Sequence, residues 1–139
     1  MSYYFRISDQ DFCIEAEKIE AAHNALFNLV REDPKTYTGQ PYTENRIGAA
    51  LKQWKKSFER LVFDLGYSLT DNGDGNVDGI YLEHDKFHDG DEMFFAAIAP
   101  FVKEGSFVQF TGEDDCMWRY AFKNGKCIEQ YPIVKWVDQ

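Results

Sequence analysis

The chain has 139 residues, of which 44% are hydrophobic and 17% aromatic, and its formal net charge at pH 7 is -9. This length and apolar content are typical of one compact domain with a single core, so residues 1–139 are taken as one domain. The excess of acidic residues argues against general nucleic-acid binding and favours a basic protein or a cation as partner, although solubility alone also accounts for such a charge.

Neither a secretory leader nor a membrane span is expected from the sequence. Met1–Arg6 has no apolar stretch of signal-peptide length, and no run approaches the roughly 18 apolar residues of a spanning helix. Cys13, Cys116 and Cys127 are odd in number and widely spaced, without a Cys-x-x-Cys pair. This pattern signals neither a disulfide framework nor a cysteine zinc site. We therefore expect a cytoplasmic protein with reduced, mostly buried thiols.

The N-terminal part predicts a short strand followed by a long helix. Residues Tyr3–Ile7 alternate between apolar and polar positions, which is typical of a strand with one buried face, and Ser8 or Asp9 could cap a helix. Apolar residues then recur every three or four positions, so that one stripe of the helix faces a core. They are Phe12, Ala16, Ile19, Ala22, Leu26, Leu29 and Val30. This helix should end before Pro34.

A loop and a second helix follow. Residues 34–45 combine two prolines, a glycine and three threonines without an apolar period, which indicates a loop within the domain. The next stripe predicts a helix from Ile47 to Leu65, with Gly66 at the position just after its end.

The middle of the chain predicts a hairpin and a third helix. Tyr67–Leu69 and Ile80–Glu83 read as two strands that flank a long tip rich in Asp, Asn and Gly. Asp89 and Glu92 have the spacing of a capping pair for a helix that ends by Gly105.

The C-terminal part predicts a three-stranded meander. Its strands are Ser106–Phe110, Met117–Phe122 and Lys126–Tyr131. Asn124-Gly125 between the last two is a strong hairpin signal, because both residues tolerate the positive φ of a type I′ turn. Pro132 limits the last strand and leaves Ile133–Trp136 as an edge segment or a tail packed on the sheet.

The elements thus follow the order β-α-α-β-β-α-β-β-β. This order predicts an α+β fold of two layers, with a mostly antiparallel sheet and helices on one face. Strands from both halves of the chain should share one sheet, so that its edges are covered, whereas the order of the strands is left open.

Part of the chain resembles an uncharacterised family of small acidic bacterial proteins. The matching segments are Ala99–Val102, Gly105–Val108, Gly112–Asp114 and Trp118–Phe122, and they form an apolar-Pro-apolar-Val, Gly-Ser-aromatic, Gly-Glu-Asp, Trp-Arg-Tyr series. The resemblance covers roughly the second half of the chain. It implies a shared fold and carries no activity, and Asp115 stands where glycine is usual.

The run Thr70–Gly79 could hold a calcium ion. With Asp74 at position 1 of a calcium loop, the oxygens of Asp74, Asn76 and Asp78 fall at positions 1, 3 and 5, with a glycine at position 6. Against a calcium loop, position 12 is Asp85 rather than the longer Glu, and the flanks read as strands. The same residue types suit the tip of a long hairpin, so a structural turn is the favoured alternative.

Other groups could in principle carry chemistry. Histidines four residues apart meet as metal ligands on a helix, but a strand separates them by more than about 12 Å. A thiol beside a histidine could act as a nucleophile, and adjacent acids could share acid–base work. The candidates are His84 with His88, Cys13 or Cys116 with a histidine, and Glu113 with Asp114 and Asp115. We expect loop histidines, inert thiols and a solvated turn, and assign no catalytic residue.

Arg119 is unusual because it lies in the middle of a strand rich in aromatic residues. The simplest expectation is an ion pair with Glu113 or Asp114 in the neighbouring turn. A small enzyme with a pocket near Arg119 and Glu113 is therefore an alternative function.

Acidic residues are dense between Asp71 and Glu92, with Lys86 as the single lysine or arginine. We call these residues the acidic rim: Asp71, Asp74, Asp78, Glu83, Asp85, Asp89, Asp91 and Glu92. Such a density steers cationic partners and can mimic phosphates. The favoured function is a non-enzymatic protein-binding module of inhibitor or immunity type that covers a basic site. The alternatives are the small enzyme and a calcium-stabilised structural domain, and the oligomeric state is left open.

Overall fold

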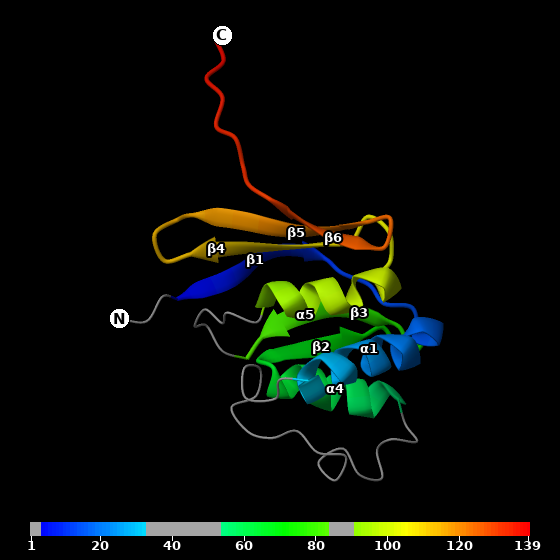
Figure 1. Ribbon diagram of the computed structural model, residues 1–139. Coiled ribbons are helices and arrows are strands. Elements are labelled where there is room, and N and C mark those ends of the chain that lie inside the picture. The colour runs from blue at the N-terminus through cyan, green and yellow to red at the C-terminus, as the bar shows by residue number, and fades with distance from the viewer. Residues whose placement is uncertain (1–3, 33–53, 84–90) are drawn as a thin grey trace.

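The computed structural model describes residues 4–32, 54–83 and 91–139, and Figure 1 shows their arrangement. It confirms the predicted α+β class and the predicted order of strands and helices. The elements are β1 (Phe5–Asp11), η1 (Ala16–Lys18), α1 (Ile19–Glu32), α4 (Trp54–Asp64), β2 (Tyr67–Asp71), β3 (Val77–Leu82), α5 (Asp91–Ile98), η3 (Ala99–Phe101), β4 (Phe107–Gly112), β5 (Met117–Lys123) and β6 (Lys126–Gln130). The expected loop at residues 34–45 and the expected start of the second helix lie outside the described residues.

The first helix begins later than the sequence pattern predicts. β1 runs through Ser8 and Asp9, so neither residue caps a helix. Phe12 and Ile14 are buried, with 1% and 0% of their surfaces exposed, before any helix has begun. Ile14 is held there by two backbone hydrogen bonds with Val77, of 3.0 and 2.8 Å. This long-range pairing overrides the helical period of the sequence, and α1 starts only after η1.

Residues with positive φ lie where the turns require them. Gly66 follows α4 with a φ of 102°, as predicted for the residue after a helix. Asn124 and Gly125 have φ values of 54° and 74°, which confirms the tight turn between β5 and β6. Asp115, in the turn before β5, has a φ of 63°, a conformation that glycine adopts at lower cost.

The strands form two sheets rather than one. The four-stranded antiparallel sheet has the order β1-β4-β5-β6, and β2 pairs with β3 in a separate hairpin. We expected strands from both halves of the chain to share one sheet. Of the strands β1, β2 and β3, only β1 joins β4, β5 and β6. The register of β1 against β4 shifts between Ile7 and Asp9, which marks a bulge. Because a bulge bends its strand, β1 is not straight along its pairing with β4.

A side chain links the two sheets where the backbones separate. The amide of Gln10 donates to the backbone oxygen of Ile80 at 2.5 Å and accepts from the backbone N–H of Ile80 at 2.7 Å. It thus takes the place that a peptide group of a neighbouring strand would occupy. The hairpin is therefore joined to β1 at one end only.

One hydrophobic core joins the helices to both sheets, with α5 at its centre (Figure 1). Phe95 of α5 lies 5.6 Å from the ring of Tyr67 in β2 and 5.0 Å from the ring of Tyr120 in β5, measured between ring centroids. The neighbouring Phe94 stacks on Tyr67 at 5.1 Å. The aromatic side chains of α5 therefore bridge the hairpin and the four-stranded sheet.

The core also holds a histidine that makes folding sensitive to pH. His23 of α1 is 1% exposed and stacks on Phe27 with ring centroids 6.0 Å apart. Burial lowers the pKa of His23 from its ordinary value of 6.5, although a hydrogen bond that the imidazole donates to the Asn24 side chain opposes the shift. The neutral form is therefore favoured in the folded state, and stability falls as the pH drops below about 6.5.

We expect this loss of stability to belong to His23. In a His84→Gln/His88→Gln background, His23 is the one remaining histidine of the three in the chain. Urea unfolding in this background should show a fall between pH 7 and pH 5.5, with about 1.4 kcal/mol lost for each unit by which the pKa is lowered. Adding His23→Gln should remove most of that fall. An unchanged slope would contradict the prediction.

The C-terminal segment corrects another expectation, because residues Ile133–Trp136 neither extend the sheet nor pack on it. Ile133 is 91% exposed and Trp136 is 94% exposed. Figure 1 shows the segment leaving the molecule beyond β6. Pro132 has no N–H to donate to a strand ladder, so the pairing of β6 ends before it.

Candidate functional site

The tip of the β2–β3 hairpin meets the chain between β1 and α1 at one end of the molecule (Figure 1). Exposed acidic residues of both segments lie there. The two segments are joined by the backbone bonds of Ile14 with Val77. They are also joined by Asn76, whose Oδ1 accepts a hydrogen bond of 2.8 Å from the N–H of Ala16. The exposed carboxylates here are Asp11, Glu15, Asp71, Asp74 and Asp78, which we call the acidic end.

The thiol of Cys13 shows how close three of these carboxylates lie. Burial raises the pKa of Cys13, Lys103 lowers it, and the charges of Glu15, Asp78 and Asp11 raise it further. Because charge interactions are screened over about 8 Å at physiological ionic strength, carboxylates that act on one thiol must lie near it. β1, the chain after it and β3 therefore bring acidic groups to one place.

Hydrogen bonds within the hairpin tip fix the positions of its acidic residues. Asp71 Oδ1 accepts from the N–H of Gly73 at 3.0 Å, and Asn72 Oδ1 accepts from the N–H of Asp74 at 3.0 Å. Gly73 has a φ of 85°, which a glycine adopts without strain. The tip is thus a sequence of turns stabilised by side-chain oxygens, as the Asp, Asn and Gly content of this run indicates.

Two of the three residues proposed as calcium ligands, Asn76 and Asp78, have other partners in this structure. Asn76 Oδ1 accepts from Ala16, and Asp78 Oδ1 accepts a hydrogen bond of 2.8 Å from the hydroxyl of Thr70. Among the residues that the structure describes, no three His, Cys, Asp or Glu side chains lie close enough together to hold a metal ion. Calcium binding by Asp74, Asn76 and Asp78 stays a prediction, while the geometry favours the structural turn.

The acidic rim is divided in the structure. Its hairpin members belong to the acidic end, but Glu83 follows the opposite end of β3, roughly 16 Å from Asp78 at about 3.3 Å per residue. Glu92 lies on α5, where its charge acts on the thiol of Cys127 in β6. The side chains of Asp85, Asp89 and Asp91 lie outside the described part of the chain.

Sequence patterns did not identify Asp11 and Glu15 as members of the acidic end. Both precede the hairpin tip by about 60 residues, and no local motif links them to it. They reach it because Ile14, between them, pairs with Val77. The local sign that the chain stays extended here is the spacing of Phe12 and Ile14, two apolar residues separated by one position, and both are buried.

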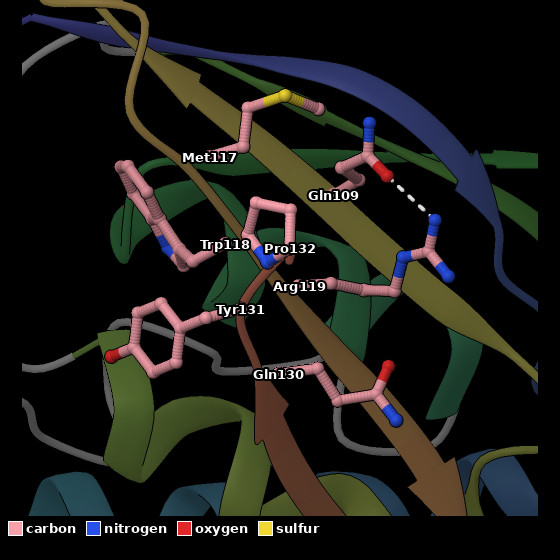
Figure 2. A pocket seen from close by; sticks show the side chains of 7 residues that line it. All are labelled: Gln109, Met117, Trp118, Arg119, Gln130, Tyr131 and Pro132. Carbon is pink, nitrogen blue, oxygen red and sulfur yellow. Dashed lines mark hydrogen bonds between the residues drawn. The ribbon is translucent and has the colours of Figure 1, made fainter. Parts of the chain in front are cut away.

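A small pocket of about 180 Å³ lies where the C-terminal segment leaves the four-stranded sheet. It is lined by Gln109, Met117, Trp118, Arg119, Gln130, Tyr131 and Pro132. Figure 2 shows the rings of Trp118 and Tyr131 on one side of Pro132, and Arg119 and Gln130 on the other. The pocket forms because β5 continues to Met117 past the last paired residue of β6.

The partners of Arg119 differ from those expected. Its guanidinium donates to Oε1 of Gln109 at 2.6 Å and lies 4.5 Å from the centroid of the Phe107 ring. The expected ion pair with Glu113 or Asp114 is therefore wrong. The register places Arg119 opposite Gln109, in the middle of the β4–β5 ladder, whereas the acidic turn lies beyond its end.

Glu113 and Arg119 belong to separate hollows of the surface. Glu113 lines a depression of about 260 Å³ with Tyr4 and Arg6, whereas Arg119 lines the pocket beside Pro132. Glu113, Asp114 and Asp115 are all exposed in the turn. The arrangement expected of a small enzyme, with both side chains at one pocket, is therefore not found in the residues that the structure describes.

None of the three thiols is activated as a nucleophile. Cys116 is exposed, which corrects the expectation of mostly buried thiols, and a hydrogen bond to Asp114 raises its pKa. Burial, with the charges of Glu129 and Glu92, raises the pKa of Cys127 to about 12. Since the thiolate is the reactive form, these thiols and Cys13 are protonated and inert at neutral pH.

Comparisons of the chain with protein-family models, with curated proteins and with solved structures find no match. The resemblance to small acidic bacterial proteins therefore stays a prediction. In the described ranges, no helix has the length and apolar character needed to cross a membrane.

Proposed function

We propose that the protein is a non-enzymatic protein-binding module of inhibitor or immunity type, which acts in the cytoplasm and binds a basic protein through its acidic end. The observation that carries this proposal is the convergence of five exposed carboxylates from three segments of the chain. An enzyme would need an activated group at a pocket. Among the described residues, the pocket beside Arg119 provides no activated group. The thiols are not activated either, because their pKa values are raised.

Two properties of the acidic end suit a binding surface. Its turns are fixed by backbone N–H groups that donate to the side-chain oxygens of Asp71, Asn72 and Asn76, so little conformational entropy is lost when a partner binds. Its charge adds to a net charge of -9, which attracts a cationic partner from a distance and speeds its association.

The test compares two variants with the same change in net charge. Asp71→Asn/Asp74→Asn/Asp78→Asn removes three charges from the acidic end and keeps the Oδ1 acceptors of its turns. The control, Glu83→Gln/Glu92→Gln/Glu113→Gln, removes three exposed charges elsewhere. Each protein is used to capture partners from the host lysate, and the dissociation constant of the recovered basic protein is measured at low and at physiological salt.

The acidic-end variant should bind about tenfold or more weakly, mainly through slower association, while the control should bind nearly as tightly as the unaltered protein. An equal loss in both variants would indicate a general effect of charge. Unchanged binding by the acidic-end variant would exclude this surface as the site. Either result would overturn the proposal.

A further inference from the structure

The C-terminal segment 131–137 is apolar, extended and exposed. Its exposed hydrophobic side chains are Tyr131, Ile133, Val134, Trp136 and Val137, each between 68% and 94% exposed. Single exposed apolar residues are common on soluble proteins, but a contiguous run of this kind marks an interaction site. Lys135 is the one charged residue between positions 131 and 137.

A groove that could receive such a segment lies between the two sheets. It has a volume of about 690 Å³ and is lined by Phe5–Gln10 of β1 and Tyr81–Glu83 at the end of β3. In the described part of the chain, β1 pairs with β4 alone. β3 pairs with β2, and its outer edge is bonded to Ile14 at Val77 and to the Gln10 side chain at Ile80. Among the described residues, the outer edges of β1 and of Tyr81–Glu83 flank the groove, and no other strand covers them.

Strand edges of this kind bind extended peptides, because their free N–H and C=O groups accept a further strand. The Gln10 side chain demonstrates this chemistry beside the groove. Its amide fills the place of a peptide group and makes both a donor and an acceptor bond with Ile80, at 2.5 and 2.7 Å. From this link the groove runs along β1 from Gln10 back to Phe5 and along the chain from Tyr81 to Glu83.

We propose that residues 133–137 of one copy of the chain bind as an added strand in the groove between β1 and β3 of a second copy. On the β1 side the lengths agree, because five extended residues span about 16 Å and the six residues Phe5–Gln10 present an edge of about 20 Å, whereas Tyr81–Glu83 present about 10 Å on the other side.

The side chains of the segment match the two faces of the groove. Val134 and Trp136 point to one side of an extended strand, and Lys135 points to the other. The face toward the core is apolar, with Phe5 buried and with Ile7 and Leu82 partly buried against the core. Val134 and Trp136 pack on this face.

The opposite face of the groove is polar. It offers the carboxylates of Asp9 and Glu83 to Lys135, with Arg6 as its one cation. A segment whose only charge is positive therefore enters a groove with two carboxylates, on a protein of net charge -9. This charge complementarity favours binding of the segment to the groove of a second copy.

A second copy is the occupant because the segment starts on the far side of the sheet. β5, β4 and β1 lie between β6 and the groove, which separates them by about 14 Å or more at roughly 4.8 Å per strand. Figure 1 shows the segment pointing away from its own β1.

The test measures self-association of the full chain by light scattering after size-exclusion chromatography, over a range of concentrations. The unaltered protein should form dimers or larger assemblies as its concentration rises. Val134→Lys/Trp136→Lys alters only exposed side chains and should leave folding unchanged, while it shifts the midpoint of association at least about tenfold. A monomeric unaltered protein, or a variant that associates as well, would overturn the proposal.

Zero-length carbodiimide coupling locates the contact. In a mixture of ¹⁵N-labelled and unlabelled chains, Lys135 should couple to Asp9 or Glu83, and half of the coupled peptides should join a labelled to an unlabelled partner. Lys135→Arg should abolish this product. Coupling confined to one isotope would mean that the segment folds back on its own chain, and coupling elsewhere would exclude the groove. These results do not depend on the acidic end, so this proposal and the proposed function can fail separately.

Discussion

Replacing Phe95 by alanine is expected to lower the free energy of unfolding by about 3–5 kcal/mol, the range for a large aromatic residue removed from a core. Phe95 is fully buried, and its ring centroid lies between 4.8 and 6.2 Å from those of Phe94, Tyr120, Tyr67, Phe110 and Phe122. These rings belong to α5, β2, β4 and β5. A cavity at this position therefore weakens the contact between the hairpin and the four-stranded sheet.

The measurement is urea unfolding followed by circular dichroism, with Phe63→Ala as the matched control. Phe63 is a phenylalanine on α4 that is 54% exposed, so its removal should change stability by about 0.5 kcal/mol or less. A loss below about 1 kcal/mol for Phe95→Ala would show that the core can collapse around the missing ring. Equal losses in the two variants would mean that burial does not decide the effect.

The order of elements could be predicted from the sequence because most of its signals are local. Alternation of apolar residues marked β4, β5 and β6, and Asn124-Gly125 fixed the turn between the last two. The predicted start of α1 was wrong because Phe12 fits two patterns. It begins the helical stripe and also belongs, with Ile14, to extended chain that pairs with Val77. Only the long-range pairing decides between them.

The division of the sheet could not be predicted, because it depends on a bulge and on one side chain. No local pattern shows that Gln10 bonds to Ile80, 70 residues away. The acidic end depends on the same region. Asp11 and Glu15 join the hairpin tip through tertiary pairing, whereas the sequence grouped Glu83 and Glu92 with the tip because they are near it in the chain. Proximity in the sequence therefore predicts the order of the elements better than it predicts which carboxylates lie together.

Replacing Gln10 by leucine is expected to cost about 2–4 kcal/mol of stability. The variant keeps the approximate size of the side chain but leaves the N–H and C=O of fully buried Ile80 without the two bonds of 2.7 and 2.5 Å. An unsatisfied buried polar group costs about 1–3 kcal/mol, and two are created here. Gln10→Glu should restore only the bond accepted from the Ile80 N–H, because an ionised carboxylate has no hydrogen to donate.

Hydrogen exchange of the Ile80 amide separates a local effect from general unfolding. In Gln10→Leu, the protection of this amide should fall by more than the loss of global stability accounts for, because the β3 edge opens first. Gln130→Leu is the control, since it makes the same replacement on β6 and should change stability by about 0.5 kcal/mol or less. If the Ile80 amide stays protected in Gln10→Leu, the hairpin is held by the Ile14–Val77 pairing alone, and Gln10 is not the link between the two sheets.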